Sequence, residues 1–238
     1  MRVATFNTCH GSNGRGTPTD QEALNAACAG IGADVLGLQE VDRGRKRSGS
    51  IDQTAAVAAA VAGVQHAFAV ALKPADGEYG NSLLVRGSID DVEELVLPSF
   101  TPPWGKKGET RSAVLASVTV DGQTCTVAVT HLSTKLLESM RQLVSLARSL
   151  RRRPGPHVLM GDLNLGPVRA DALLRPFGLR PTRDGGPTHP RRHPKMRIDH
   201  LAISAGLTIG EVEVVDTGRS DHRALVAEIT FEESATRS

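Results

Sequence analysis

Short apolar runs with the composition of β-strands recur along this whole chain, and they constrain its fold more than any other feature. Most are too short for helices, and turn residues bound them. The clearest pair, at 112–120 and 124–132, is separated by Asp121-Gly122, a dipeptide typical of tight hairpins. The predicted strands are 2–8, 34–41, 66–72, 81–87, 92–98, 112–120, 124–132, 157–164, 197–204, 208–216 and 223–231.

Helical periodicity interrupts the strands at a few places. Pro18 and Thr19 open a helix of roughly a dozen residues, and Asp52 caps an Ala-rich helix that runs to about Gly63. The remaining predicted helices are 135–152 and 170–177. No repeat or linker divides the chain. We therefore predict two sheets with outer helices in a single domain, residues 1–231, followed by a C-terminal tail, residues 232–238.

Composition narrows the class of protein. With 39% hydrophobic and 23% charged residues, the chain has the composition of a globular protein rather than a disordered, collagenous or coiled-coil one. A net charge of +2 and 3% aromatic residues do not by themselves indicate a nucleic-acid partner. Cys9, Cys28 and Cys125 cannot all pair, which favours a reducing compartment. With no leader and no membrane span, we expect a cytoplasmic protein, and we expect a monomer.

Polar side chains stand at the ends of several predicted strands, where a buried strand would not need them. If the strands form two packed sheets, these ends can converge on one rim. The residues concerned are Asn7, Glu40, His131, Asp162, Asn164, Asp199, Asp221 and His222. Each of them alone is more often structural than functional. Their joint occurrence favours a site.

The chemistry of this set points to a divalent cation and phosphate esters. Four carboxylates at one place repel one another unless a cation lies among them. Oxygen ligands with few histidines and no cysteine indicate Mg²⁺, Mn²⁺ or Ca²⁺ rather than Zn²⁺. Such a cation neutralises charge on a phosphoryl group. A histidine oriented by an aspartate can then activate the attacking water.

The order of these motifs resembles that of a known superfamily. Reading along the chain, they are N, QE, YGN, R, THL, GDLN, RIDH and SDH. This order is similar to that of the endonuclease/exonuclease/phosphatase superfamily, whose fold is DNase I-like, and the likeness covers residues 3 to 229. It implies an α+β fold, a four-layer αββα sandwich of two packed, mostly antiparallel sheets flanked by helices. It also implies a Mg²⁺- or Mn²⁺-dependent phosphoesterase.

The resemblance implies roles for the residues near the metal and the water. Glu40 matches the metal-binding glutamate, Asn7 the asparagine of the first strand, and Asp221 a second carboxylate beside the metal. His222 matches the catalytic histidine, and Asp199 the aspartate that orients it.

It implies further roles at the phosphate. Asp162 and Asn164 match the pair that positions the attacking water and the phosphate. His131 matches a second histidine that binds phosphate. Tyr79 and Arg111 match a tyrosine and an arginine of the site.

The resemblance leaves the substrate open. We expect a nuclease or other phosphodiesterase, with nucleic acid as the leading substrate class. The alternatives are a small-molecule phosphatase, a sphingomyelinase-like phosphodiesterase acting on lipid headgroups, and a non-catalytic scaffold. Signatures of the inositol phosphatases and the aromatic-bearing loops of abasic-site enzymes are absent from the sequence.

Other segments near these motifs have two interpretations each. Basic residues follow Glu40 closely and form either a phosphate-binding rim or a solvated loop: Arg43, Arg45, Lys46 and Arg47. Lys106 and Lys107 precede Arg111 in the same way. The loop 180–196, rich in Pro, Arg and His, is a candidate flap over the substrate. Glu78 is a candidate partner of His131, by resemblance to the secreted nucleases. Cys9 and His10 are interpreted as loop residues.

Overall fold

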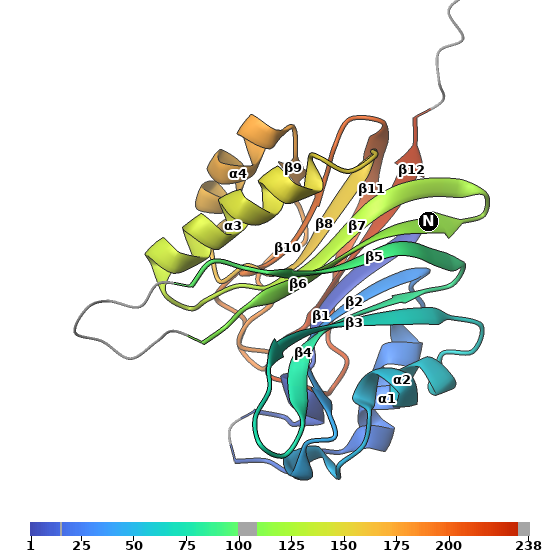
Figure 1. Cartoon of the computed structure of the whole chain (residues 1–238), viewed down its shortest axis with the longest axis vertical. Helices are drawn as coiled ribbons and strands as arrows, with labels where there is room; N and C mark the ends of the chain where they lie inside the picture. Colours follow the sequence, from blue (N-terminus) through green and yellow to red (C-terminus); the bar gives the residue numbers. More distant parts are fainter. Residues whose placement is uncertain (15, 100–108, 233–238) are drawn as a thin grey trace, which may run out of the picture.

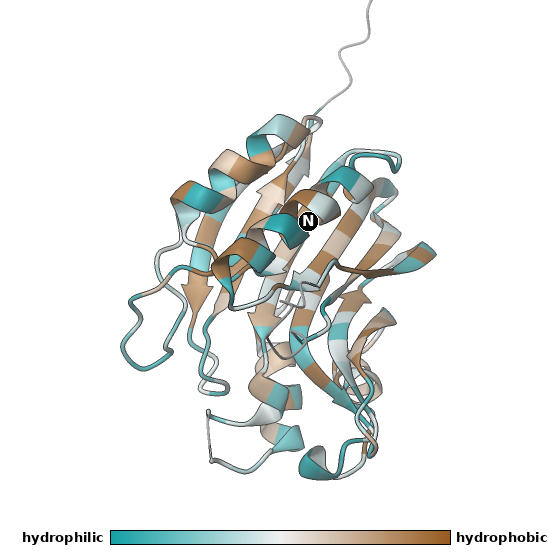
Figure 2. Cartoon of the chain, turned by 60° about the vertical axis from the view of Figure 1, so that its left-hand side comes forward, coloured by the Kyte–Doolittle hydropathy of each residue, from teal (hydrophilic) through white to brown (hydrophobic). Residues whose placement is uncertain are grey.

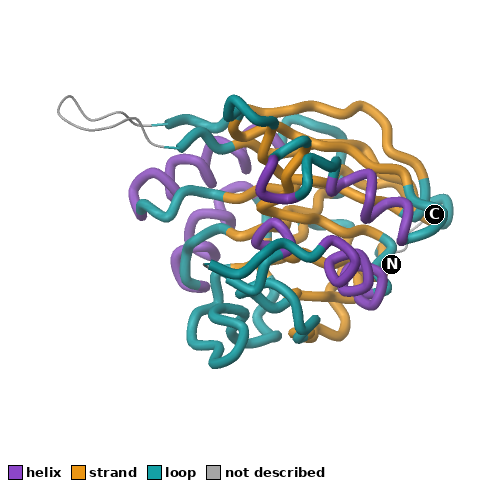
Figure 3. Tube along the Cα trace, turned by 90° about the horizontal axis from the view of Figure 1, so that it is seen from below, coloured by secondary structure: helices purple, strands orange, loops and turns teal. Residues whose placement is uncertain are grey.

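A computed structural model of the chain describes residues 1–14, 16–99 and 109–232. Two sheets of six strands each pack face to face, and helices cover their outer faces (Figure 1). This is the predicted four-layer αββα sandwich. Seen from below, the helices flank the strands and the connecting loops lie beyond the strand ends (Figure 3). Lys106 and Lys107 lie outside the described residues.

The first sheet has the strand order β11-β12-β1-β2-β4-β3. Its strands β1 and β2 are parallel, and the other neighbours are antiparallel. The bounds are β1 Arg2–Asn7, β2 Val35–Arg43, β3 Gln65–Leu72, β4 Glu78–Val85, β11 Leu207–Val215 and β12 Ala224–Phe231.

The second sheet has the order β5-β6-β7-β8-β10-β9, and its one parallel pair is β7 and β8. The predicted hairpin at Asp121-Gly122 joins β6 and β7 in continuous register. The bounds are β5 Ser88–Val96, β6 Ser112–Val120, β7 Gln123–His131, β8 His157–Asp162, β9 Arg180–Pro181 and β10 Asp199–Ile203.

Helices α1 (Gln21–Ile31) and α2 (Gln53–Ala60) pack on the first sheet, and α3 (Leu136–Leu150) and α4 (Pro167–Leu174) on the second (Figure 1). Short 3₁₀ helices are η1 Cys9–Gly11, η2 Lys46–Ser48 and η3 Arg175–Phe177.

The residues that cap the helices explain where the observed helix boundaries differ from the predicted ones. The first helix begins at Gln21, later than predicted, because Asp20 is its cap and accepts a hydrogen bond from the Ala23 amide. The cap predicted at Asp52 is confirmed by its bond from Ala55 N–H. The helix predicted at 170–177 begins earlier, at Pro167, a residue suited to the first helical position.

Three apolar layers hold the sandwich together. The central layer lies between the sheets and contains buried Val, Leu, Ile and Met side chains from both, such as Val85, Val129 and Met160. Each outer layer lies between one sheet and its pair of helices and buries one face of these helices. Figure 2 shows hydrophobic residues, coloured brown, along both the strands and the helices. Because Gly37 has no side chain, Met160 and Val129 can approach its backbone closely. A Cβ there would lie 2.9 Å from Met160 Sδ.

The two sheets use the same pattern of neighbours around their parallel pairs. In the first sheet, β1 and β2 are parallel, with antiparallel β12 and β4 beside them. In the second, β8 and β7 are parallel, with antiparallel β10 and β6 beside them. The carboxyl ends of both parallel pairs and the amino ends of their antiparallel neighbours meet at one end of the sandwich.

Candidate functional site

Each of the four central strands in each sheet carries predicted site residues at this shared end. The first sheet supplies Asn7 from β1, Glu40 from β2, Tyr79 from β4, and Asp221 and His222 just before β12. The second sheet supplies His131 from β7, Asp162 from β8, Arg111 just before β6, and Asp199 from β10, with Asn164 after β8.

The Asn7 side chain connects the two sheets. Its Nδ2 donates to Glu40 Oε1 at 3.2 Å in the first sheet and to Asp162 Oδ2 at 3.1 Å in the second. Its Oδ1 accepts from the Cys9 amide at 3.1 Å. One buried amide therefore fixes two carboxylates relative to each other.

His222 and Asp199 form a buried pair. His222 Nδ1 lies 2.9 Å from Asp199 Oδ2, and the same oxygen accepts a hydrogen bond from the Thr188 hydroxyl. Asp199 Oδ1 is buried and has no hydrogen-bond partner among the described residues. The opposite ring nitrogen, His222 Nε2, lies 3.8 Å from Asp162 Oδ2. The imidazole is thus held on one side and directed into the site on the other.

Burial and neighbouring charge shift the pKa values in opposite ways within this group. Burial alone would lower the pKa of His222, but the carboxylates of Asp199, Asp162 and Asp221 raise it to about 10. Burial, together with the charge of Asp199, raises the pKa of Asp162 to about 7. Burial also raises the pKa of Glu40. Carboxylates crowded in this way favour a cation among them.

His131 belongs to the same cluster as a neutral imidazole. Burial, with the positive charge of Arg111, holds its pKa well below the usual range. Its Nε2 lies 3.2 Å from Asn164 Nδ2 and 3.5 Å from Asp162 Oδ2, and its Nδ1 lies 3.9 Å from Glu40 Oε1. Asn164 is fixed by two hydrogen bonds. Its side-chain Nδ2 donates to Leu132 O, and its backbone N–H donates to Asp162 Oδ1.

Tyr79 and Arg111 are almost fully buried beside this cluster. Arg111 donates to Glu109 from one nitrogen, while its Nε and Nη1 have no hydrogen-bond partner among the described residues. The charge of Arg111 lowers the pKa of Glu40, opposing the effect of burial, which is larger. Burial raises the pKa of Tyr79 well above its usual value. Two nitrogens of Arg111 are therefore without a partner within the described part of the chain.

Left-handed backbone conformations concentrate around the site. Of eight non-glycine residues with positive φ in the described chain, five flank it: Cys9, His10, Glu40, Asn164 and Ser220. Such conformations each cost about 1–3 kcal/mol and persist where the surrounding structure enforces them. Here the enforcing contacts include the Ser220 hydroxyl, which donates to Asn7 O at 2.6 Å. The fold therefore holds the backbone around the site in these conformations.

His189 lies in the loop 180–196, the predicted flap, and its ring contacts that of His222 at a tilt of 45°. Its ring centroid lies 4.5 Å from that of His222, and its Nε2 lies 3.9 Å from Asp221 Oδ2. Backbone bonds around it include Arg223 N–H to Thr188 O. The flap prediction pointed to the right segment, but only the packing shows which residue reaches the site.

The basic loop after Glu40 is paired with acids in the structure. The ion pairs are Arg43–Glu78, Arg45–Asp76 and Arg47–Asp42. Glu78 also forms an ion pair with Lys73. Among the described contacts, Glu78 therefore pairs with Arg43 and Lys73 rather than with His131, which lies next to Glu40 and Asp162. The arginines of this loop are therefore largely neutralised.

Among the residues described, no helix is both long and apolar enough to cross a bilayer.

Comparison with known proteins gives one family and several structural neighbours. The family model described as "Endonuclease/Exonuclease/phosphatase family" matches residues 4–222. A search of curated proteins found no match.

Three solved structures illustrate the likeness of fold. An endonuclease/exonuclease/phosphatase from Beutenbergia cavernae is 24% identical, with a TM-score of 0.74, covering 97% of this chain and 71% of that one. The mannosyl-6-phosphatase Bt3783 of Bacteroides thetaiotaomicron is 17% identical, with a TM-score of 0.74, covering 97% and 100%. Truncated Caenorhabditis elegans TDP2 is 18% identical, with a TM-score of 0.71, covering 97% of each chain.

Proposed function

This chain belongs to the endonuclease/exonuclease/phosphatase family, and from that premise we propose that it is a divalent-metal-dependent phosphoesterase that hydrolyses phosphodiester bonds. The observation that carries the proposal is the buried Asp199–His222 pair, whose free nitrogen faces a cluster of carboxylates. A histidine oriented by an aspartate is suited to remove a proton from water.

The residues present fit Mg²⁺ or Mn²⁺. Glu40 and Asp221 would hold the cation with oxygen donors of the kind these ions prefer. Asn7 would join them by turning its side-chain amide, because its Oδ1 accepts from the Cys9 amide and its Nδ2 faces Glu40. The fit is supported by Glu40, whose pKa is raised by burial and, to a smaller extent, by the nearby Asp221 carboxylate, because a cation between these two groups would offset both effects. When bound, the cation would neutralise charge on the phosphoryl and leaving oxygens.

The protein's own groups supply the proton transfer. Asp199 accepts a hydrogen bond from His222 Nδ1–H, so Nε2 is the atom that can take a proton from water. Asp162, with its Oδ2 3.8 Å from Nε2, helps to position that water for in-line attack, which inverts the phosphorus centre. For this role His222 must be deprotonated. Positive charge among the neighbouring carboxylates would lower its pKa from about 10.

The phosphate would be held by donors from the second sheet. Asn164 and His131 lie beside Asp162, and Arg111 offers two buried nitrogens without partners. Preorganised donors of this kind stabilise charge that develops in the transition state. Tyr79, buried next to Arg111 and Glu40, adds a hydroxyl in the same region.

Two substrate classes are candidates, nucleic acid and a small phosphorylated molecule, and one observation favours the small molecule. Nucleic acid is the leading class from sequence. A small phosphorylated molecule is favoured by the ion pairs of Arg43, Arg45 and Arg47, because neutralised arginines add little to a track for a polyanionic backbone.

A direct assay tests the proposal. Purified protein in Mg²⁺ or Mn²⁺ is given supercoiled plasmid, an abasic-site duplex and bis-p-nitrophenyl phosphate, with His222→Ala as the control. Hydrolysis by wild type alone supports the phosphodiesterase. Nicking that weakens steeply with salt indicates nucleic acid, and turnover of the small diester with shallow salt dependence indicates the second class. Equal rates for wild type and His222→Ala on every substrate would reject it.

A further inference from the structure

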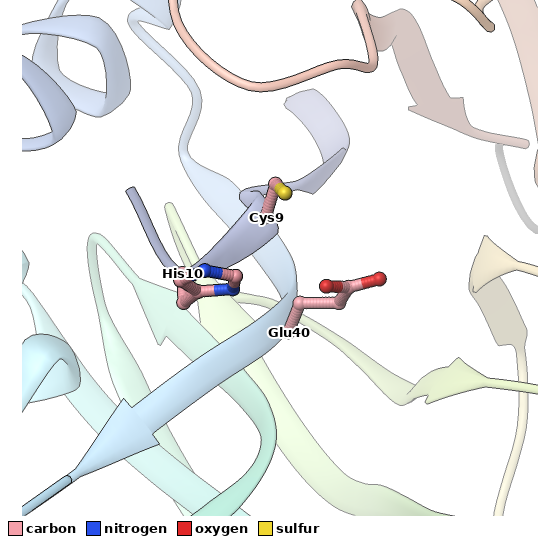
Figure 4. A group of neighbouring side chains, drawn as sticks. All are labelled: Cys9, His10 and Glu40. Atoms are coloured by element: carbon pink, nitrogen blue, oxygen red, sulfur yellow. The ribbon is translucent and has the colours of Figure 1, made fainter. Parts of the chain in front are cut away.

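Cys9 and His10 place a thiol and an imidazole next to Glu40. The potential ligand atoms of these three residues all lie within 4.8 Å of one another. Figure 4 shows the group: Cys9 and His10 come from the short helix η1, which follows β1, and Glu40 comes from β2. Sulfur, nitrogen and oxygen donors thus meet at the residue proposed to hold the catalytic cation.

The turn that presents these side chains is held by specific contacts. Cys9 and His10 have φ values of 46° and 45°, which are unfavourable for side-chain-bearing residues. The Cys9 amide donates to Asn7 Oδ1, and the His10 carbonyl accepts from Thr19 and from Gln53 Nε2, each at 3.1 Å. The positions of the two donors are therefore fixed by the fold.

The proposed hydrolysis uses neither donor. The Cys9 thiol lies 3.2 Å from the Ser12 hydroxyl and beside the Asp221 carboxylate. His10 Nδ1 is buried and has no hydrogen-bond partner among the described residues. Mg²⁺ gains little from sulfur or imidazole, because it prefers oxygen. Zinc-like ions bind thiolate and imidazole strongly, usually with four ligands.

We propose that Cys9, His10 and Glu40 form a binding site for a thiophilic divalent cation such as Zn²⁺, and that occupation of this site inhibits the enzyme. Sulfur binds as the thiolate, so the thiol proton passes to solvent when the ion enters. A water molecule would complete the usual set of four ligands. Since Glu40 is shared, the thiophilic ion and the catalytic cation compete. The inhibitory part rests on the proposed function, whereas the binding part does not.

Ligation by sulfur distinguishes this site in an experiment from the second group of potential metal ligands. Asp162, Asp199 and His222 also bring ligand atoms together, but they offer only oxygen and nitrogen. A Co²⁺ or Cd²⁺ ion bound by Cys9 produces a thiolate-to-metal charge-transfer band, and an ion bound at the second cluster does not.

The binding test uses cation-free protein and two probes, Zn²⁺ in calorimetry and Co²⁺ in absorbance. Cys9→Ser removes the sulfur at nearly constant size. His10→Asn removes the imidazole with a residue that tolerates the left-handed conformation. Each should weaken Zn²⁺ binding by more than the roughly 10–100-fold typical of changes outside the ligand shell. Cys9→Ser should also abolish the charge-transfer band.

Cys125→Ser is the matched control, because Cys125 is buried between the sheets in the central apolar layer. It should keep the wild-type Zn²⁺ affinity and band, and circular dichroism verifies the fold of all three variants. A wild type without a sulfur band, or Zn²⁺ affinity unchanged in Cys9→Ser, overturns the proposal.

The activity test follows separately. Zn²⁺ added to the Mg²⁺-loaded enzyme should inhibit hydrolysis, excess Mg²⁺ should relieve the inhibition, and Cys9→Ser should require at least tenfold more Zn²⁺ for the same inhibition. Inhibition at the same Zn²⁺ concentration in wild type and Cys9→Ser would overturn the inhibitory part. If no substrate is hydrolysed at all, the proposed function fails, while the binding result stands by itself.

Discussion

The two sheets build the site with the same arrangement of strands but deliver different kinds of residue. The second sheet supplies His131, Asp162 and Asp199 from regular strand ends, each buried to more than nine-tenths. The first sheet supplies Glu40 with a left-handed backbone and a side chain 25% exposed, and Asp221 with a side chain 38% exposed.

This difference indicates a division of labour. The second sheet holds its hydrogen-bonding groups, and the aspartate that orients His222, deep in the protein. The dielectric constant is low there, so electrostatic interactions are strong. Partial exposure lets the first sheet present oxygen ligands to an ion arriving from solvent. The buried half, which consists of the second-sheet residues and of His222 from the first sheet, should control the rate. The exposed half, Glu40 and Asp221, should control affinity for the cation.

Removal of the proton acceptor should have the largest effect. His222→Ala should lower kcat by about 10²–10⁴-fold, because a positioned general base contributes that much. The cation concentration for half-maximal activity should not change. The measurement is kcat over a Mg²⁺ titration. Recovery of activity at high Mg²⁺ would instead place His222 in the metal-binding half.

Glu40→Gln should show the opposite pattern. Loss of a charged ligand should raise the Mg²⁺ concentration for half-maximal activity by at least about tenfold, with partial recovery of kcat at saturation. Glu211→Gln, on an exposed position of β11, is the control and should match wild type. An unchanged Mg²⁺ requirement in Glu40→Gln would break the division between the two sheets.

Glycines in the two parallel pairs should differ in their tolerance of a methyl group. In β8, a Cβ on Gly161 would lie 1.9 Å from the Thr130 carbonyl oxygen, at a φ of +149°. In β2, a Cβ on Gly37 would meet only side chains, which can shift. Gly37→Ala should destabilise the protein by about 1–3 kcal/mol, and Gly161→Ala by more. Urea unfolding checks this order, and a reversed order would contradict it.

A further expected effect is the pH dependence of the cation-free protein. The pKa of His222 in the fold, about 10, exceeds its unfolded value of 6.5. Its stabilising contribution is therefore complete below pH 6.5 and is lost as pH rises through 10. The pKa of Asp162, about 7, exceeds 3.8, so its contribution is lost as pH rises through 7. The free energy of unfolding should fall from pH 4 to 10.

Urea unfolding across this range, for wild type and His222→Gln, measures the effect. The variant should lose the alkaline part of the slope, and Mg²⁺ should flatten the slope in wild type by lowering both pKa values. NMR titration of the His222 ring provides the direct reading. A ring that titrates below pH 7 without cations would show that the second-sheet carboxylates do not hold its proton.

Several features of the fold could be predicted from sequence because they depend on local patterns. Alternating apolar runs predicted the strands, Asp121-Gly122 predicted a hairpin that the structure contains, and Asp52 predicted a helix cap. Most errors are boundaries: β4 begins at Glu78, before the predicted residue 81, and so includes Tyr79. The two-residue strand β9 lies in the predicted loop 180–196 and was missed. Boundaries depend on caps and on pairing with neighbouring strands, which a single segment does not contain.

By itself the sequence determined that carboxylates and histidines end several strands and that their order is similar to that of one superfamily, because strand periodicity and motif order are properties of the chain alone. The tertiary structure decided which of these groups touch. It set the bridge from Asn7 to Glu40 and Asp162, the ring contact of His189 with His222, the pairing of the arginines after Glu40, and the meeting of Cys9 and His10 with Glu40. The physical reason is that these contacts join residues far apart in the chain or on neighbouring strands. Sheet register and packing fix their distances, and local preference does not.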